Sequence, residues 1–179
     1  MRIKAILLLI LTLSFPITTF AKDITLNNVP SQVYFSPHGG CTEAIVNTLN
    51  HAKTEVLVQA YSFTSAPIAK ALVEAHKRGV HVEVILDKSN KNKSGKYSAA
   101  DFTAHAEIPT FIDSAHSIAH NKVMVIDKET VITGSFNFTR AAENNNAENL
   151  LIIKSPELAR EYISNWEKHR RHSEAYEGR

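Results

Sequence analysis

A histidine and a lysine two residues apart are the groups in this chain best suited to chemistry on a charged substrate. His120 and Lys122 precede the apolar run 123–126, which Asp127 ends. The β-branched content of 123–126 and 130–133 predicts two strands joined by a turn at 127–129. Because side chains alternate faces along a strand, the imidazole of His120 and the ammonium of Lys122 are expected to point the same way.

A second polar cluster follows the second of these strands. It consists of Gly134, Ser135 and Asn137, and the alternation rule places Ser135 and Asn137 on one face. If the two strands pair, a base or nucleophile, a fixed positive charge, an amide and a hydroxyl meet in one small volume. Such a set suits an anionic, oxygen-rich centre, and phosphate is the obvious candidate. For His120 and Lys122 in isolation, a solvated strand face would be the better interpretation.

The spacing H-x-K-x4-D, followed by G-S-x-N, resembles the HKD signature of the phospholipase D superfamily. The resemblance is strongest to its small bacterial Nuc-like endonucleases, includes the segment 60–64 (AYSFT), and extends over nearly all of the chain after Lys22. It implies a metal-independent phosphodiesterase in which a histidine attacks phosphorus. The residues that match the family pattern are His120 as nucleophile, Lys122, Ser135 and Asn137 around the phosphate oxygens, Glu148 as partner of the imidazole ring, and Asp127 and Gly134 in structural roles.

The family's chemistry needs two such motifs, and this chain has one. His51-x-Lys53 is the only other H-x-K, but Val58 stands where an aspartate is required, and no G-S-x-N follows. It falls in a segment of helical spacing and is interpreted as chance. A two-fold homodimer would supply the second motif, because the same patch meets itself across the axis. The expectation is therefore a composite active site on a dimer axis.

The first 21 residues have the pattern of a secretory signal peptide. Arg2 and Lys4 precede an apolar stretch that is short for a membrane span, and Thr19-Phe20-Ala21 provides a cleavage site. The alternative is an uncleaved anchor, which would place the protein at a membrane. The expected organisation is a signal peptide at 1–21 and one domain at 22–179, in a periplasmic or secreted protein.

Charge and cysteine content add little to the choice of substrate. The chain has 20 Lys+Arg and 18 Asp+Glu, and loss of Arg2 and Lys4 with the signal segment would leave 18 of each. Net charge therefore gives no argument for a nucleic-acid partner. Cys41 is the single cysteine, predicted to be buried at the start of a helix, with an intersubunit disulfide as the alternative.

No metal or other cofactor is expected at the catalytic centre. The chain has nine histidines, and His116 and His120 are four residues apart, but it has one cysteine and no H-E-x-x-H motif. Lys122 would provide the positive charge that a metal provides elsewhere.

The order of elements predicts an α/β protein, an α/β/α sandwich with a mixed sheet and helices on both faces. Early strands and helices alternate, and the later elements are mostly strands. Besides the two motif strands, strands are expected at 33–35, 55–63, 80–86, 110–113 and 150–153, and helices at 42–53, 66–78, 97–106 and 156–171.

Nucleic acid is the preferred substrate, with a lipid phosphodiester as the alternative and a catalytically inactive nucleic-acid-binding module as the third reading. The loop 88–96 carries Lys88, Lys91, Lys93 and Lys96, and is either a phosphate-tracking lip or an ordinary solvated loop. The sequence leaves open DNA or RNA, one strand or two, and the biological role.

Overall fold

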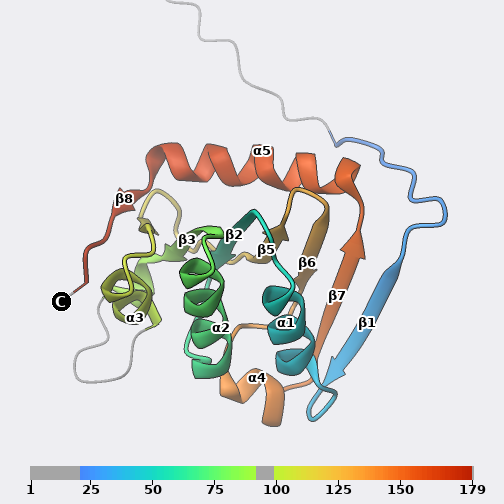
Figure 1. The fold of residues 1–179 in the computed structure, drawn as a ribbon, viewed down its shortest axis with the longest axis horizontal. Coiled ribbons are helices and arrows are strands. Elements are labelled where there is room, and N and C mark those ends of the chain that lie inside the picture. Colours follow the sequence, from blue (N-terminus) through green and yellow to red (C-terminus); the bar gives the residue numbers. More distant parts are fainter. Residues whose placement is uncertain (1–20, 92–98, 179) are drawn as a thin grey trace, which may run out of the picture.

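An eight-stranded mixed sheet runs through the residues that the computed structural model describes, which are 21–91 and 99–178 (Figure 1). Its strand order is β1-β7-β6-β5-β2-β3-β4-β8. The strands are β1 (Ser31–Ser36), β2 (Glu55–Ala60), β3 (His81–Asp87), β4 (Thr110–Asp113), β5 (Lys122–Ile126), β6 (Thr130–Gly134), β7 (Glu148–Lys154) and β8 (Glu174–Ala175). The helices are α1 (Cys41–Asn50), α2 (Ala66–Lys77), α3 (Ala99–His105), α4 (Arg140–Asn144) and α5 (Pro156–His172), with a short 3₁₀ turn, η1 (Lys88–Asn90).

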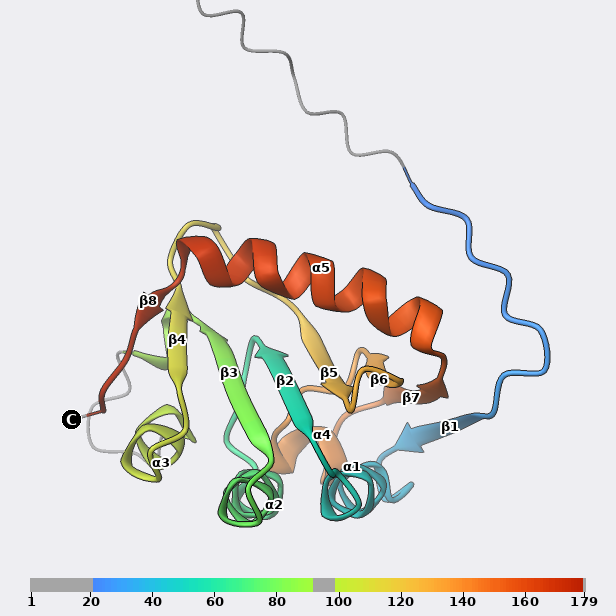
Figure 2. The same ribbon diagram turned by 45° about the horizontal axis from the view of Figure 1, so that its top comes forward.

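The helices cover both faces of this sheet, which confirms the predicted sandwich. Figure 2 shows α1, α2 and α3 beneath the sheet and α5 across its other face. Alternate residues of one strand feed the two cores: Val84 and Leu86 pack on the side of α1 and α2, and Ile85 packs on the side of α5. On that second side Trp166 of α5 is buried, and its indole nitrogen donates a hydrogen bond to the carbonyl oxygen of Val58 at 2.9 Å.

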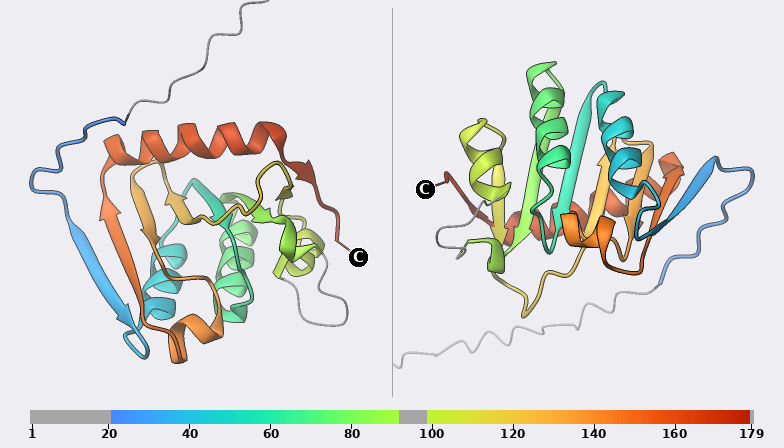
Figure 3. Two further views of the ribbon diagram at one scale, coloured as in Figure 1. Left: turned by 180° about the vertical axis from the view of Figure 1, so that it is seen from behind. Right: turned by 90° about the horizontal axis from the view of Figure 1, so that it is seen from below.

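The topology combines a parallel centre with an antiparallel half. β2, β3 and β4 are parallel, and β5, β6, β7 and β1 are attached to β2 by antiparallel pairing. The first three therefore end at the edge of the sheet where β5 and β7 begin. Figure 3 shows this arrangement from behind and from below, with α5 on the face opposite α1 and α2.

Most predicted elements are present, with shifted ends. The strand predicted at 55–63 ends at Ala60, and the helix predicted at 42–53 ends at Asn50. α4 and β8 were not predicted. α4 is only five residues long and β8 only two, too short for a periodic pattern. Residues 97 and 98 of the helix predicted at 97–106 lie outside the described residues.

Two sequence predictions concern segments that are largely not described. Of the signal segment 1–21 only Ala21 lies within the described residues, and residues 92–96 of the lysine-rich loop lie outside them. Among the described helices, none has the length and hydropathy required to cross a membrane. Cys41 is the first residue of α1 and is fully buried, as predicted. Burial, with the charge of Glu143 nearby, raises the pKa of its thiol to about 11.

Candidate active site

The predicted catalytic residues gather at one edge of the sheet because their strands are neighbours there. Lys122 at the start of β5 pairs with Ala60 at the end of β2. The β5–β6 register, continued by two pairs, places Lys122 beside Gly134 at the end of β6. Gly134 in turn pairs with Leu150 of β7. The polar ends of β5, β6 and β7 therefore form one row, as the strand predictions required.

Lys122 is held with its charge out of water. The residue is 7% exposed, and its ammonium donates a hydrogen bond to the carbonyl oxygen of His120 at 2.9 Å. The same nitrogen lies 5.1 Å from the centre of the Tyr61 ring, within range of a cation–π contact. Burial lowers the pKa of Lys122, and the negative charge of Glu148 opposes part of that shift. An anion bound beside Lys122 would be drawn to a poorly hydrated positive charge.

His120 is exposed, and its backbone is fixed from both sides. Asp87 at the end of β3 accepts a hydrogen bond from the backbone N–H of Ala119 at 2.8 Å, and the N–H of Tyr61 donates to the carbonyl of Asn121 at 2.8 Å. The imidazole lies against Tyr61, with ring centres 4.6 Å apart. Among the described residues nothing hydrogen-bonds to this ring, so both ring nitrogens are open to a substrate or a partner.

Ser135 and Asn137 lie on a short segment that two phenylalanines fasten to the protein. Phe136 and Phe138 are fully buried, and the residues between and before them are half-buried, as the predicted alternation requires. The carbonyl oxygen of Phe138 accepts hydrogen bonds from Thr64 and Ser65, both at 2.9 Å, which secures the segment against the chain that follows β2.

The side chains of Asn137 and Ser135 differ in their hydrogen bonds to the rest of the protein. The side-chain oxygen of Asn137 is buried and has no hydrogen-bond partner among the described residues. Because this oxygen accepts no hydrogen bond, the protein does not fix the orientation of the Asn137 amide, and a ligand could do so. Ser135 Oγ instead accepts hydrogen bonds from the backbone N–H and the side-chain amide of Asn149, at 3.0 and 3.3 Å. Its hydroxyl hydrogen remains available for donation.

Gly134 stands where the backbone leaves no room for a side chain. Its φ of +148° lies in the region that favours glycine, and a Cβ there would stand 2.3 Å from the carbonyl oxygen of Asn149. That carbonyl accepts hydrogen bonds from the N–H groups of Ser135 and Phe136, at 3.1 and 3.2 Å. The absence of a side chain at Gly134 thus allows β7 to orient the polar segment.

Asp127 lies at the opposite edge of the sheet, away from His120. Its carboxylate accepts hydrogen bonds from the backbone N–H groups of Lys53, Thr54 and Glu55 and from the Thr54 hydroxyl, at 2.7 to 3.1 Å. It ties the β5–β6 turn to the start of β2. His51 and Lys53 lie at this same edge, which separates the second H-x-K from the site.

Glu148 was expected to orient the His120 ring. It is the first residue of β7 rather than a residue preceding the strand, and its carboxylate accepts a hydrogen bond from the Asn146 side chain at 3.1 Å. It acts electrostatically on Lys122. Within one chain its carboxylate is not hydrogen-bonded to His120, so its role as partner of the ring stays a prediction.

Tyr61 is the site residue whose importance the sequence did not reveal. Of the four aromatic residues near the motifs, Phe63, Phe136 and Phe138 are fully buried, whereas Tyr61 is half-buried and touches both His120 and Lys122. Its position directly after a buried strand is the signal that could have identified it.

Comparison with known proteins identifies the family. A family model described as the cardiolipin synthase, phospholipase D-like domain matches residues 45–170. This chain belongs to the phospholipase D superfamily. Among its relatives, the phospholipase D of Rickettsia conorii is 47% identical over 132 residues, which are 74% of this chain and 65% of that protein. The mitochondrial cardiolipin hydrolase of Homo sapiens is 30% identical over 133 residues, 74% of this chain and 52% of that protein.

Solved structures of the superfamily have the same fold. Nuc from Salmonella typhimurium superposes with a TM-score of 0.78 at 39% identity, over 83% of this chain and 99% of that chain. NucT from Helicobacter pylori gives a TM-score of 0.74 at 23% identity, over 83% of this chain and all of that one, which shows the fold alone. The chain spans somewhat less than two thirds of the length of the Rickettsia relative, whereas it covers the Nuc chain almost completely.

Proposed function

We propose that this member of the phospholipase D superfamily is a metal-independent phosphodiesterase that acts as a non-specific endonuclease on DNA or RNA. The observation that carries the proposal is the exposed His120 ring beside the buried ammonium of Lys122. An unoccupied imidazole is a nucleophile toward phosphorus, and a desolvated ammonium attracts the phosphate oxygens.

The reaction proceeds in two displacements at phosphorus. His120 of one chain attacks, a P–N bond forms and a P–O bond breaks, while His120 of the partner subunit gives a proton to the leaving oxygen. That second histidine then takes a proton from water, and the resulting hydroxide attacks the phosphohistidine and breaks the P–N bond. Lys122 and Asn137 hold the non-bridging oxygens, and each such donor contributes about 3 kcal/mol to transition-state stabilisation.

A two-fold dimer is part of this proposal because one chain provides one histidine. The described residues place His51-x-Lys53 at the far edge of the sheet, where it cannot reach the His120 site. Ile118, two residues before His120, is 57% exposed and would be covered if the motif-bearing edges of two chains met. Isologous pairing then builds one composite site on the axis.

The similarity to Nuc favours nucleic acid as the substrate, because this chain matches 99% of the Nuc chain at 39% identity. Binding would be mainly to the sugar–phosphate backbone and would fall steeply with salt. Hydrolysis of a phospholipid head group is the second candidate, supported by the names of the Rickettsia phospholipase D and the human mitochondrial cardiolipin hydrolase. A membrane would be a partner only if the N-terminal segment is retained.

The test compares residues 22–179 with a His120→Ala variant on two substrates in excess EDTA. The nuclease proposal expects nicking of supercoiled plasmid by the wild type and not by the variant. Cleavage of vesicles containing phosphatidylcholine or cardiolipin, with plasmid left intact, would replace it by the lipid function. Loss of plasmid cleavage on brief EDTA treatment would contradict the metal-independent mechanism.

A further inference from the structure

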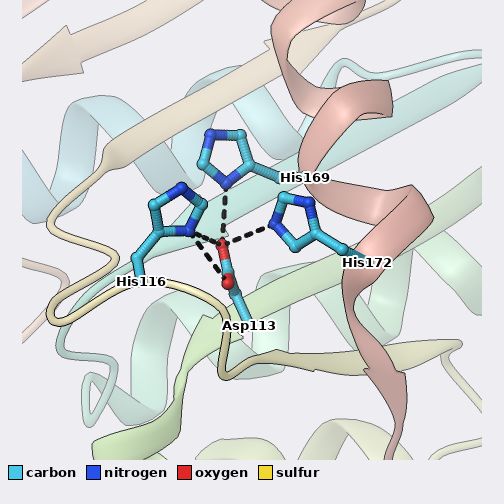
Figure 4. A group of neighbouring side chains, drawn as sticks. All are labelled: Asp113, His116, His169 and His172. Atoms are coloured by element: carbon cyan, nitrogen blue, oxygen red, sulfur yellow. Dashed lines mark hydrogen bonds and ion pairs between the residues drawn. The ribbon is translucent and has the colours of Figure 1, made fainter. Parts of the chain in front are cut away.

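Three histidines and a buried aspartate converge where the end of β4 meets the last turn of α5. Asp113 ends β4, His116 lies in the loop that leads to His120, and His169 and His172 lie in the last turn of α5 (Figure 4). One nitrogen of each ring and one carboxylate oxygen lie within 4.8 Å of one another. His116 is four residues from His120 in sequence, but in the structure its ring lies beside Asp113, His169 and His172.

The four groups already approach the shape of a metal site. Asp113 Oδ2 lies 3.1 Å from His116 Nδ1, 2.7 Å from His169 Nδ1 and 3.4 Å from His172 Nε2. In a tetrahedral zinc site with bonds of about 2.0–2.1 Å, neighbouring ligand atoms lie about 3.3 Å apart. Three of the six ligand–ligand distances are therefore near that value, and the other three are no longer than 4.8 Å.

The Asp113 carboxylate is fixed in place, and a neighbouring cationic side chain points away from the cluster. Asp113 is fully buried, and its other oxygen accepts a hydrogen bond from the backbone N–H of Ala115 at 3.1 Å, which orients the carboxylate. The neighbouring Arg170 is turned away, stacked 3.3 Å over Phe111 and paired with Glu83. The side chains of His116 and His172 are partly exposed, which gives an ion a route in from solvent.

The donor atoms are of the kind that such a cation prefers. Three imidazole nitrogens and one carboxylate oxygen form a donor set typical of Zn²⁺ and related borderline cations.

We infer that Asp113, His116, His169 and His172 form a structural binding site for Zn²⁺ or a similar divalent cation. Four protein ligands close the coordination sphere and leave no position for a substrate. The ion would replace the protons that the three ring nitrogens direct at Asp113 and would join β4, α5 and the loop 114–121. This site is separate from the metal-independent chemistry proposed for His120, and its test does not depend on catalysis.

The experiment measures metal retention and thermal stability in the full chain carrying no polyhistidine tag. The protein is stripped with chelator, incubated with Zn²⁺ alone and dialysed, and bound zinc is counted by elemental analysis. The proposal expects about one zinc per chain and a rise in Tm of about 5–10 °C. Co²⁺ in place of Zn²⁺ should give the visible absorption of a tetrahedral complex.

Variants decide whether the ion is at this cluster. His116→Gln and His169→Gln should each lose the zinc, the cobalt spectrum and the Tm rise. His51→Gln, an exposed histidine at the end of α1, should keep all three. Absence of retained zinc in the wild type, or zinc retained equally by both cluster variants, would overturn the proposal; the first outcome would leave a hydrogen-bonded cluster around Asp113.

Discussion

The ammonium group of Lys122 donates a hydrogen bond to the carbonyl oxygen of His120, at 2.9 Å, so the two residues of the H-x-K motif are joined through the backbone. The lysine thus has two tasks, to fix the chain at the histidine and to carry charge to the phosphate. The burial of Lys122 favours both tasks. A charge with little water around it interacts strongly with the carbonyl oxygen of His120 and with a phosphate oxygen.

Replacing Lys122 with Met should separate activity from stability. Loss of an oxyanion donor is expected to lower kcat about 10²- to 10³-fold. Tm should stay the same or rise, because removing a buried charge relieves its desolvation cost. Lys122→Arg, which keeps the charge in a planar group of different geometry, should retain intermediate activity. Plasmid nicking rates with thermal melts measure this, and a Lys122→Met enzyme within threefold of wild type would refute it.

The ring of Tyr61 should matter more than its hydroxyl. Tyr61→Phe keeps the surface against which His120 and Lys122 lie and should retain near wild-type kcat/KM. Tyr61→Ala frees the imidazole to rotate and should lower kcat/KM about tenfold or more, since small misplacements of a catalytic group are costly. Steady-state kinetics of the two variants test the idea, and equal effects would assign the role to the hydroxyl.

A composite site should give a characteristic response to mixing. If each dimer needs His120 from both chains, equal amounts of wild type and His120→Ala, allowed to exchange subunits, leave about one quarter of the dimers fully wild type. Specific activity should fall to about one quarter of the wild-type value, against one half for independent sites. Mixing with His51→Ala should leave activity unchanged. Sedimentation of the mixture checks that dimers are present.

Asp127 should contribute stability that disappears in acid. Burial alone would raise the pKa of its carboxyl, but hydrogen bonds from Thr54, Glu55 and Lys53 hold it below the ordinary value. A carboxyl with a lowered folded-state pKa stabilises fully above its unfolded pKa of about 4 and loses that effect as the pH falls through the folded value.

Asp127→Ala is therefore expected to cost about 2–3 kcal/mol at pH 7, since several hydrogen bonds to a charged group are lost. The deficit should shrink below about pH 4. Urea unfolding at several pH values measures both. A deficit that is independent of pH would show that the charge is not the cause.

Gly134→Ala should destabilise the fold more than another glycine replacement at positive φ. The new Cβ would stand 2.3 Å from the backbone oxygen of Asn149 and would displace β7. A cost of about 3 kcal/mol or more is expected. Gly79 also has positive φ, +87°, but nothing within 4 Å, so Gly79→Ala should cost only about 1 kcal/mol. If urea unfolding gives the same loss of stability for both variants, the contact with the Asn149 oxygen is not the cause.

Local patterns predicted the site, and long-range packing determined what they missed. His120 and Lys122 are close in sequence, as are Ser135 and Asn137, so each pair could be predicted to lie together. The predicted strands are shorter in the structure, because β5 begins at Lys122 and β6 ends at Gly134. Tyr61 is brought to His120 by pairing between β2 and β5, and Asp113 meets His169 across 56 positions of sequence. No spacing rule links such residues, because the first contact depends on which strands pair and the second on how α5 crosses the sheet.

The pairing of β1 with β7 has a consequence for the order in which the chain folds. Ser31 is opposite Ile153, so the first strand has its partner near the end of the chain. During synthesis β1 therefore stays unpaired until nearly the whole domain has been made, and such distant pairing is slow. Val33 and Phe35, still 54% and 64% exposed in the folded protein, are accessible throughout that interval. The nascent chain thus has an unpaired strand with exposed hydrophobic side chains near its N-terminus. We expect chaperones that bind unfolded chains to recognise this strand until residue 154 has been added.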